Sequence, residues 1–122
     1  MYIGHTDNGI TMVRFVIQYV ADDWLFIEQF VIKADDQTFT IDKGHFDVSR
    51  DNSAGEIWEW IDESAGDREI SIARAIAESD RAVIRHRGDQ YHYDRVITNN
   101  EKQAIRQTLE AADALVRREN LK

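Results

Sequence analysis

The sequence predicts an α+β fold, with an antiparallel β-sheet that carries two helices on one face, the second helix being C-terminal. The first half of the chain alternates apolar and polar residues with the period of two that is typical of strands. Helical periodicity occurs only in two later segments, and the second of these is C-terminal. Because strands and helices do not alternate strictly, the order favours α+β over a parallel α/β sheet.

Residues 12–20 and 24–33 are the first predicted strands. Period two places four side chains of the first segment on one face: Val13, Phe15, Ile17 and Tyr19. Asp7-Asn8-Gly9 before it is typical of a tight hairpin turn, because Asn-Gly tolerates positive φ angles. Residues 24–33 are apolar on both faces, which predicts a central strand covered on each side, with Trp24 in the core.

Three more segments complete the first half. Residues 38–42 are a predicted strand with Phe39 and Ile41 inward, and residues 45–50 are a candidate short strand before a polar loop at 51–55. Residues 56–62 are another strand, on which Trp58 and Trp60 share a face, and one or the other of them is expected to be partly exposed. Its carboxylates indicate an exposed edge strand rather than paired acid–base catalysts. They are Glu56, Glu59, Asp62 and Glu63.

Segment 81–97 contains the candidate binding residues. A two-residue loop at Gly88-Asp89 would set Arg87 opposite Gln90, Arg85 opposite His92 and Val83 opposite Asp94. The polar face of this hairpin carries four candidate ligand-binding residues, Arg85, Arg87, His92 and Asp94. Guanidinium groups suit a carboxylate or phosphate, whereas the commoner alternative is a solvated face whose charges pair across the strands. The other face is apolar and aromatic, with Ala82, Ile84, His86, Tyr91, Tyr93 and Arg95.

Two helices follow from capping and periodicity. Asp67 is the predicted N-cap of a helix over 68–79, whose inward face holds Ile72, Ala73, Ile76 and Ala77. Thr98 and Glu101 form a capping box at the start of the second helix, which runs to about Arg118. Its apolar stripe consists of Ile105, Leu109, Ala112 and Val116.

Length and composition limit the function classes. At 122 residues the chain is expected to be one domain, residues 1–122, with a core of its own. The net charge of −8 argues against nucleic acid as a partner and favours a basic protein partner, or solubility alone. No apolar run is long enough for a membrane span, and the N-terminus lacks the pattern of a signal peptide. A complete chain would be cytoplasmic, and a trimmed one periplasmic or secreted.

Known catalytic and cofactor motifs are missing from the sequence. It contains no cysteine, no glycine-rich phosphate loop, no HExxH and no serine in a nucleophile-elbow context. His45 with Asp47 and His92 with Asp94 share a spacing of two, but no third ligand fixes a metal geometry. We therefore expect no catalytic residues, no metal and no other cofactor.

Four sequence runs resemble segments of small conserved bacterial proteins that have no assigned activity. They are DDWLFIEQFVIKADDQTF, GEIWEWID and RGDQYHYDRVI, followed by NNEKQAI. The resemblance spans about Val13 to Ala112. It implies a single-domain α+β protein and assigns no catalytic residues.

Two function classes remain. The first is a non-enzymatic binding or protein-interaction protein, inhibitor-like or immunity-like, which small size, acidic charge and missing catalytic motifs favour. The second is a small-molecule or anion binder, extending to a hydrolase, that uses the polar face of the 81–97 hairpin. A deep pocket would favour the second class, and a flat acidic or aromatic surface the first.

Overall fold

The strands of this protein form two antiparallel sheets. The computed structural model describes residues 2–5, 11–44 and 47–120, and side chains over 13–44 and 47–114. The first sheet has the order β1 (Tyr2–His5), β2 (Thr11–Ala21), β6 (Glu56–Ser64) and β5 (Ser49–Ser53). The second has the order β4 (Gln37–Asp42), β3 (Gln29–Ala34), β7 (Ala82–Arg87) and β8 (His92–Val96). The helices are α1 (Asp67–Glu78) and α2 (Asn99–Asn120).

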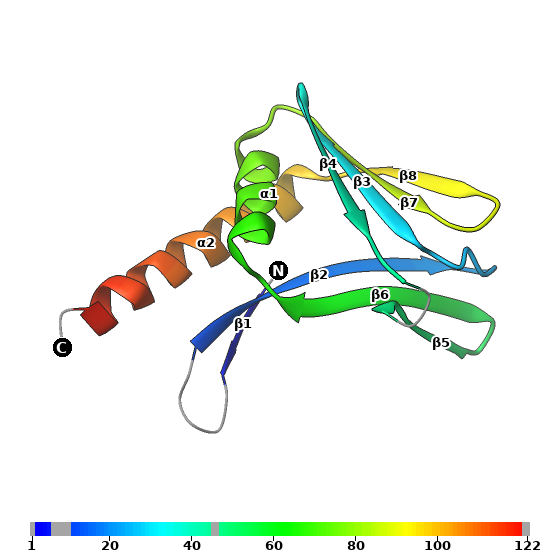
Figure 1. The fold of residues 1–122 in the computed structure, drawn as a ribbon, viewed down its shortest axis with the longest axis horizontal. Helices are drawn as coiled ribbons and strands as arrows, with labels where there is room; N and C mark the ends of the chain where they lie inside the picture. Colours follow the sequence, from blue (N-terminus) through cyan, green and yellow to red (C-terminus); the bar gives the residue numbers. More distant parts are fainter. Residues whose placement is uncertain (1, 6–10, 45–46, 121–122) are drawn as a thin grey trace.

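The predicted α+β class is confirmed, with antiparallel strands, two helices and a C-terminal second helix. The division into two sheets was not predicted. Figure 1 shows the two sheets close together where β2 connects to β3 and diverging towards the opposite end, where both helices lie. Helix α1 connects β6 of the first sheet to β7 of the second. None of the described helices has the length and apolar character to cross a membrane.

The hydrophobic core lies between the sheets and against α1. The predicted inward residues of β2 are confirmed in part, since Phe15 and Ile17 are buried and Tyr19 packs at the edge of the core. The predicted inward face of α1 is confirmed in full, because all four of its residues are buried: Ile72, Ala73, Ile76 and Ala77. Each large aliphatic side chain removed from water here contributes about 1.5–3 kcal/mol of hydrophobic stabilisation.

The segment before β3 does not form the predicted strand. The strand begins at Gln29 instead of Trp24, and Phe26 has a φ of 56°. Trp24 is half-buried rather than in the core, and Phe26 is 45% exposed. A continuous apolar run resembles a strand in the sequence, but here tertiary contacts hold a tight irregular turn.

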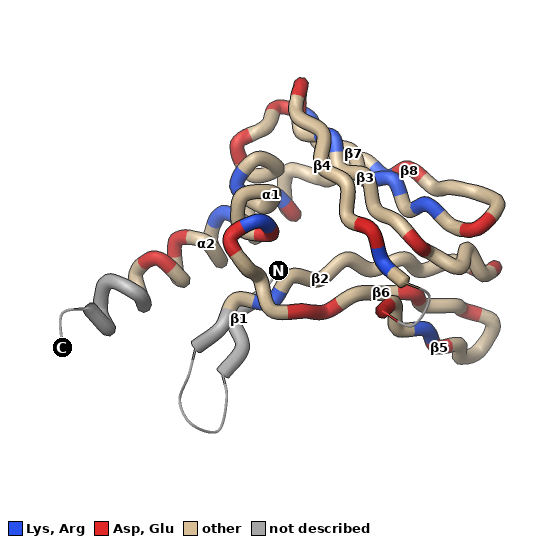
Figure 2. The backbone as a smooth tube through the Cα atoms, in the orientation of Figure 1, with Lys and Arg blue, Asp and Glu red and all other residues tan. Residues whose placement is uncertain are grey.

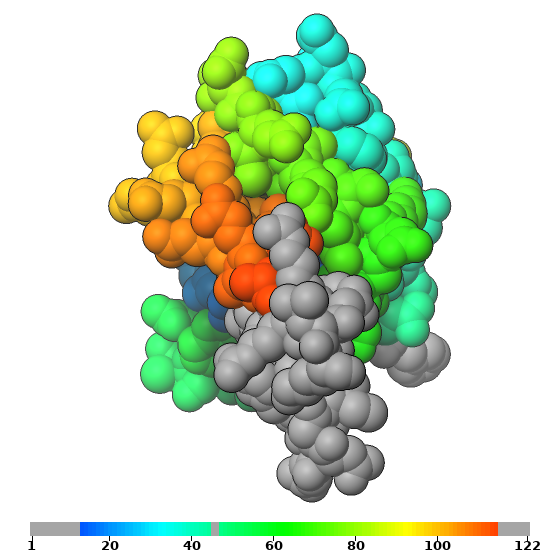
Figure 3. All heavy atoms as spheres, turned by 90° about the vertical axis from the view of Figure 1, so that its left-hand side faces the viewer, coloured from blue at the N-terminus to red at the C-terminus, as the bar shows by residue number. Residues whose placement is uncertain are grey.

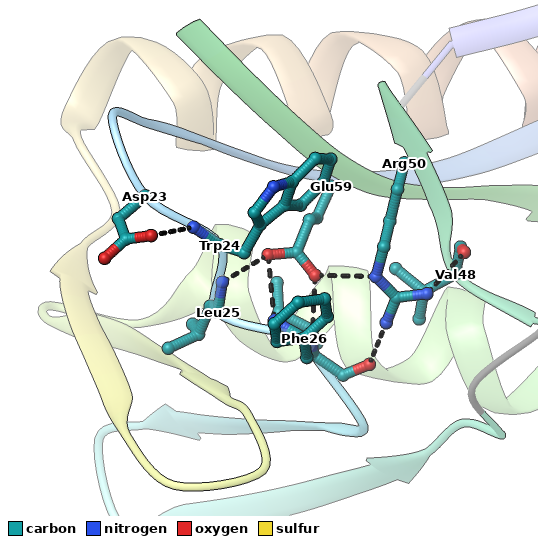
Figure 4. A network of polar contacts seen from close by, with 8 residues as sticks. Asp23, Trp24, Leu25, Phe26, Val48, Arg50 and Glu59 are labelled. Atoms are coloured by element: carbon teal, nitrogen blue, oxygen red, sulfur yellow. Dashed lines mark hydrogen bonds and ion pairs between the residues drawn. The ribbon is translucent and has the colours of Figure 1, made fainter. Parts of the chain in front are cut away.

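A buried carboxylate holds this turn. Glu59 is fully buried and accepts hydrogen bonds from the main-chain N–H groups of Leu25 (2.8 Å), Phe26 (3.1 Å) and Ile27 (2.9 Å). Arg50 pairs with Glu59 at 3.0 Å, and Figure 4 shows the two side chains meeting beside the turn. The edge-strand prediction for β6 is therefore wrong, since β6 is central and its Glu59 is a structural anchor.

The tip of the β7–β8 hairpin packs against the same turn. Glu28 N–H donates to the carbonyl of Arg87 at 2.9 Å. A Cβ added at Gly88 would lie 1.8 Å from the Leu25 carbonyl oxygen. Only glycine permits this approach of the two main chains, so the Gly88 position depends on a tertiary contact as well as on turn geometry.

The helix starts are close to the predictions. Gly66, not Asp67, is the N-cap of α1, because Glu69 reaches back and accepts the Gly66 N–H at 3.1 Å. The predicted capping box of α2 is confirmed by hydrogen bonds from Glu101 N to Thr98 Oγ1 (3.2 Å) and from Thr98 N to Glu101 Oε1 (3.1 Å). The predicted polar loop at 51–55 is instead the second half of β5 and its turn into β6.

Helix α2 packs beside α1 on the surface shown in Figure 3. Leu109 is buried and Ile105 packs against the core, as predicted. Lys102 Nζ donates to the carbonyls of Ser79 (3.2 Å) and Asp80 (2.8 Å), just beyond the C-terminal end of α1. The predicted contact of Val116 and the turn at residues 7–9 lie outside the parts of the chain that the structure describes.

Candidate ligand cavity between the two sheets

A cavity of about 530 Å³ opens between the two sheets and the helices. We call it the inter-sheet cavity. Its apolar wall comes from both sheets and α1, and includes Phe15, Ile17, Ile32, Ile76, Ile84 and Ile97. Its polar lining residues come mainly from β2, the β7–β8 hairpin and the start of α2, and are Gln18, Tyr19, His86, Tyr93, Arg95 and Glu101. This volume and this mixture are typical of small-molecule sites in proteins.

His86 is the most unusual group in the wall. Its side chain is 1% exposed, and its Nδ1 has no hydrogen-bond partner within the described residues. Burial, with a smaller contribution from Arg95, lowers the pKa of His86 to about 4, so the imidazole is neutral at neutral pH. An unsatisfied buried polar group costs about 1–3 kcal/mol, which a ligand could recover by hydrogen bonding.

Aromatic rings surround His86. The ring centroids of Tyr19 and Phe30 lie 5.7 Å and 5.6 Å from that of the imidazole. Tyr93 lies 5.7 Å from Tyr19 in an edge-on arrangement and 6.2 Å from His86. Burial, followed by the charge of Glu59, raises the pKa of Tyr19, so its phenol stays protonated. The site therefore offers neutral aromatic surface with hydrogen-bonding groups.

An ion pair lies at the end of the cavity where α2 begins. Arg95 donates to Glu101 at 2.6 Å, and Glu101 also accepts from the Thr98 N–H. The hydrogen bond from Arg95 is the main cause that lowers the pKa of Glu101 to about 2. This pair is ionised, so one end of the site is strongly polar while the wall behind it is apolar.

An open strand edge forms another side of the cavity. Strand β1 pairs with β2 only over residues 11–14. The Val13 carbonyl accepts from Ala65 N–H at 2.8 Å, so in β2 the odd-numbered residues point their main-chain groups towards β6. The main-chain N–H and C=O groups of the even-numbered residues therefore point away from β6. Among these residues, Val16, Gln18 and Val20 line the cavity. No strand in the described part of the chain pairs with this edge.

The predicted polar residues lie on the opposite face of the hairpin. The observed register sets Arg85 opposite Asp94 and Arg87 opposite His92, because residues 88–91 separate the two strands. The predicted register was therefore wrong by two residues. A shift of two preserves the faces, and the four candidate residues still share one face.

These four residues are exposed and partly paired. Arg85 donates to both oxygens of Asp94, at 2.8 Å and 3.0 Å. This hydrogen bonding lowers the pKa of Asp94 and raises that of Arg85. Arg87 makes a long contact of 3.5 Å with Gln29. None of the four residues lines the inter-sheet cavity. Anion binding by this face stays a prediction.

The sequence signal for the cavity lies on the apolar and aromatic face of the hairpin, where the predicted alternation places His86, Tyr93 and Arg95. A histidine within an otherwise apolar strand face was the available sign. Of the two spaced His/Asp pairs, His45 lies outside the described residues, and Asp47 accepts the Gly44 N–H at 3.0 Å. Within the described residues no group of His, Asp and Glu is arranged to hold a metal.

Comparison of this chain with protein-family models, with curated proteins and with solved structures finds no match.

Proposed function

We propose that this protein binds a small, largely apolar molecule in the inter-sheet cavity, with one polar group of the ligand hydrogen-bonded to His86. The observation that carries the proposal is the unpartnered Nδ1 of His86 in the wall of a cavity of about 530 Å³. A protein interior normally pairs its buried polar groups, and an exception is a reason to look for a ligand. The apolar wall favours an aromatic or aliphatic ligand.

The polar groups around the cavity favour an uncharged ligand over an anion. Arg95 is already neutralised by Glu101, and His86 is neutral. A ligand carboxylate would therefore meet little positive charge. A phenol, alcohol or amide can complete the hydrogen bonding of His86 without burying an unpaired charge. We infer that the natural ligand is uncharged at its buried end.

A matched pair of probes tests this proposal. p-Cresol and toluene have similar shape, but only p-cresol can donate to the imidazole. In calorimetric titrations p-cresol should bind roughly tenfold more tightly than toluene, as a hydrogen bond of about 1.4 kcal/mol requires. The His86→Leu variant should lose this preference and keep toluene binding. Arg87→Ala, on the outer face of the same hairpin, should behave as the wild type.

Equal binding of both probes by the wild type would contradict the role of His86. Failure of both probes to bind would contradict the cavity as a small-molecule site.

A protein-interaction role is the second candidate function, and the solvent exposure of Phe26 favours it. This side chain is 45% exposed at a φ of 56° and stacks on Trp24, with ring centroids 5.9 Å apart. Bulky residues rarely adopt positive φ, and strained exposed aromatics often lie at functional surfaces. Asp22 and Asp23 beside the pair favour a basic partner. If Phe26 serves binding rather than folding, Phe26→Gly should leave thermal stability unchanged or raised.

A further inference from the structure

A second hollow lies on the outer face of the first sheet. Its volume is about 320 Å³, and it is lined by Val16, Gln18, Asp51, Trp58 and Trp60. The sheet register explains why these residues meet. Trp60 lies between Gln18 of β2 and Ser49 of β5, and Trp58 lies between Val20 of β2 and Asp51 of β5. The helices do not cover this face in Figure 1.

The tryptophans are placed for contact with a ligand. Trp58 and Trp60 are half-buried, whereas their neighbours Glu59 and Ile61 on β6 are buried on the opposite, core-facing side. The indoles therefore contribute nothing to the core between the sheets. The two indoles share one strand face at a spacing of two, and both line the hollow together with Val16.

Asp51 adds a negative charge at the same place. It is exposed, and its Oδ1 accepts the Asn52 N–H at 2.8 Å. Within the described residues Asp51 takes part in no ion pair, unlike Asp62 on the same face, which pairs with Arg14. Figure 2 shows other acidic positions distributed over both sheets, and the net charge of the chain is −8. The surrounding field therefore favours a cation.

We propose that this hollow binds a quaternary ammonium group, and we call it the tryptophan site. Such a group interacts with the electron-rich faces of indoles, and its methyl groups contact apolar surface without needing hydrogen bonds. A primary ammonium is strongly hydrated, and it would give up hydrogen bonds to water against the indoles and Val16, which offer it no acceptor. The site shares the lining residues Val16 and Gln18 with the inter-sheet cavity but lies on the other face of β2, and it does not depend on the function proposed for that cavity.

NMR titration with choline tests the proposal in the wild-type protein. The indole N–H signals of Trp58 and Trp60 should shift saturably with a dissociation constant on the order of millimolar, as expected for cation–π contacts at a partly exposed site. The indole of Trp24 lies outside the site, and its N–H signal should not shift. The analogue of choline with carbon in place of nitrogen has the same shape without the charge, and should bind at least about fivefold more weakly.

Variants separate the roles of charge and aromatic surface. Asp51→Asn should weaken choline binding about threefold to fivefold, in line with the energy of an exposed ion pair. Asp36→Asn, which removes an equal charge at the turn between β3 and β4, should leave it unchanged. Trp60→Leu should abolish measurable binding, and Trp60→Tyr should retain part of it. Retained binding by the tyrosine variant excludes simple misfolding as the cause of the loss.

The source of the ammonium group can be read from two further probes. Tetramethylammonium tests the head group alone, and a short peptide with trimethyl-lysine tests recognition of a modified protein. Tighter binding of the peptide than of choline assigns the group to a protein partner, and the reverse assigns it to a small molecule. No saturable shift with any of the probes, or equal binding of choline and its carbon analogue, would overturn the proposal.

Discussion

The two faces of the β7–β8 hairpin contain similar side chains in opposite situations. On the outer face Arg85 and Asp94 pair in water, with side chains 46% and 42% exposed, and His92 is exposed. On the inner face His86 is buried and its Nδ1 is without a partner in the described structure. The sequence of the outer face is typical of a binding site, but its charges are solvated and partly paired. The inner face carries the buried nitrogen atom without a hydrogen-bond partner, to which a ligand can bind.

The same contrast separates two arginine–carboxylate pairs. Arg50 and Glu59 are 14% and 0% exposed, and Glu59 also holds three main-chain N–H groups. Arg85 donates two hydrogen bonds to Asp94, at 2.8 Å and 3.0 Å, but this pair lies in solvent. Surface pairs contribute about 0–1 kcal/mol, whereas breaking a buried pair costs about 3–5 kcal/mol. Burial, more than the geometry of the pair, decides its importance.

The largest expected effect is the loss of the buried carboxylate. Glu59→Gln should lower the free energy of unfolding by about 3–5 kcal/mol, because Arg50 loses its counter-charge and one acceptor of the turn is replaced by a donor. Asp94→Asn is the matched control and should cost no more than about 1 kcal/mol. Denaturant unfolding of both variants measures the difference. Similar losses in the two variants would show that burial does not separate the pairs.

The packing of α2 gives the next effect. Leu109→Ala should cost about 2–5 kcal/mol as a large-to-small change at a buried position, and Thr98→Ala about 1 kcal/mol through loss of the cap. Glu110→Ala, on the exposed side of the same helix, is the control. Urea melts report all three. Negligible losses for Leu109→Ala and Thr98→Ala alike would show that α2 is peripheral to the fold.

The pH dependence of stability tests the environment of His86. Its pKa is lowered to about 4 in the folded protein, so above about pH 6.5 both states are neutral there and this group adds no pH dependence. As the pH falls from 6.5 to 4 the unfolded chain binds the proton first, and stability should fall by about 3 kcal/mol.

His86→Leu should remove this part of the slope without loss of stability at neutral pH, whereas His92→Asn should keep it. Thermal unfolding of the three proteins over this pH range makes the comparison. An unchanged slope in His86→Leu would mean that the imidazole is hydrated.

The prediction of anion binding concerns the outer face and has the smallest expected effect. Arg85 is already engaged by Asp94, so Arg87 provides most of the available positive charge. Inorganic phosphate should bind weakly, and Arg87→Ala should weaken it more than Arg85→Ala. Calorimetry at low salt measures both. Binding that survives both substitutions would place any anion site elsewhere.

These contrasts explain which features could be predicted from sequence. Period-two and helical patterns are local, and they correctly indicated the inward residues Phe15, Ile17 and Ile72. The faces of the hairpin survived an error in its register, since a shift of two residues keeps every side chain on its side. The capping box at Thr98 depends on residues only three positions apart, so it could also be predicted from the sequence.

Features that depend on strand order could not be predicted in the same way. The sequence around Glu59 does not show that β5 pairs with the edge of β6 opposite β2. This pairing makes β6 a central strand, and Glu59 is buried on it. The turn at Phe26 exists because that distant carboxylate accepts its main-chain N–H groups. Likewise, the division into two sheets creates the inter-sheet cavity, and no local pattern specifies which strands diverge.

NMR of the His86 imidazole tests the central claim most directly. Nitrogen signals of selectively labelled histidine distinguish a neutral ring from a charged one and a free Nδ1 from a hydrogen-bonded one. We predict a His86 ring that stays neutral down to about pH 4, and an Nδ1 signal that shifts saturably with p-cresol but little with toluene. The signal of His92 should not respond to either probe. A His86 ring that titrates near its ordinary value of about 6.5, or an Nδ1 that ignores p-cresol, would contradict the account.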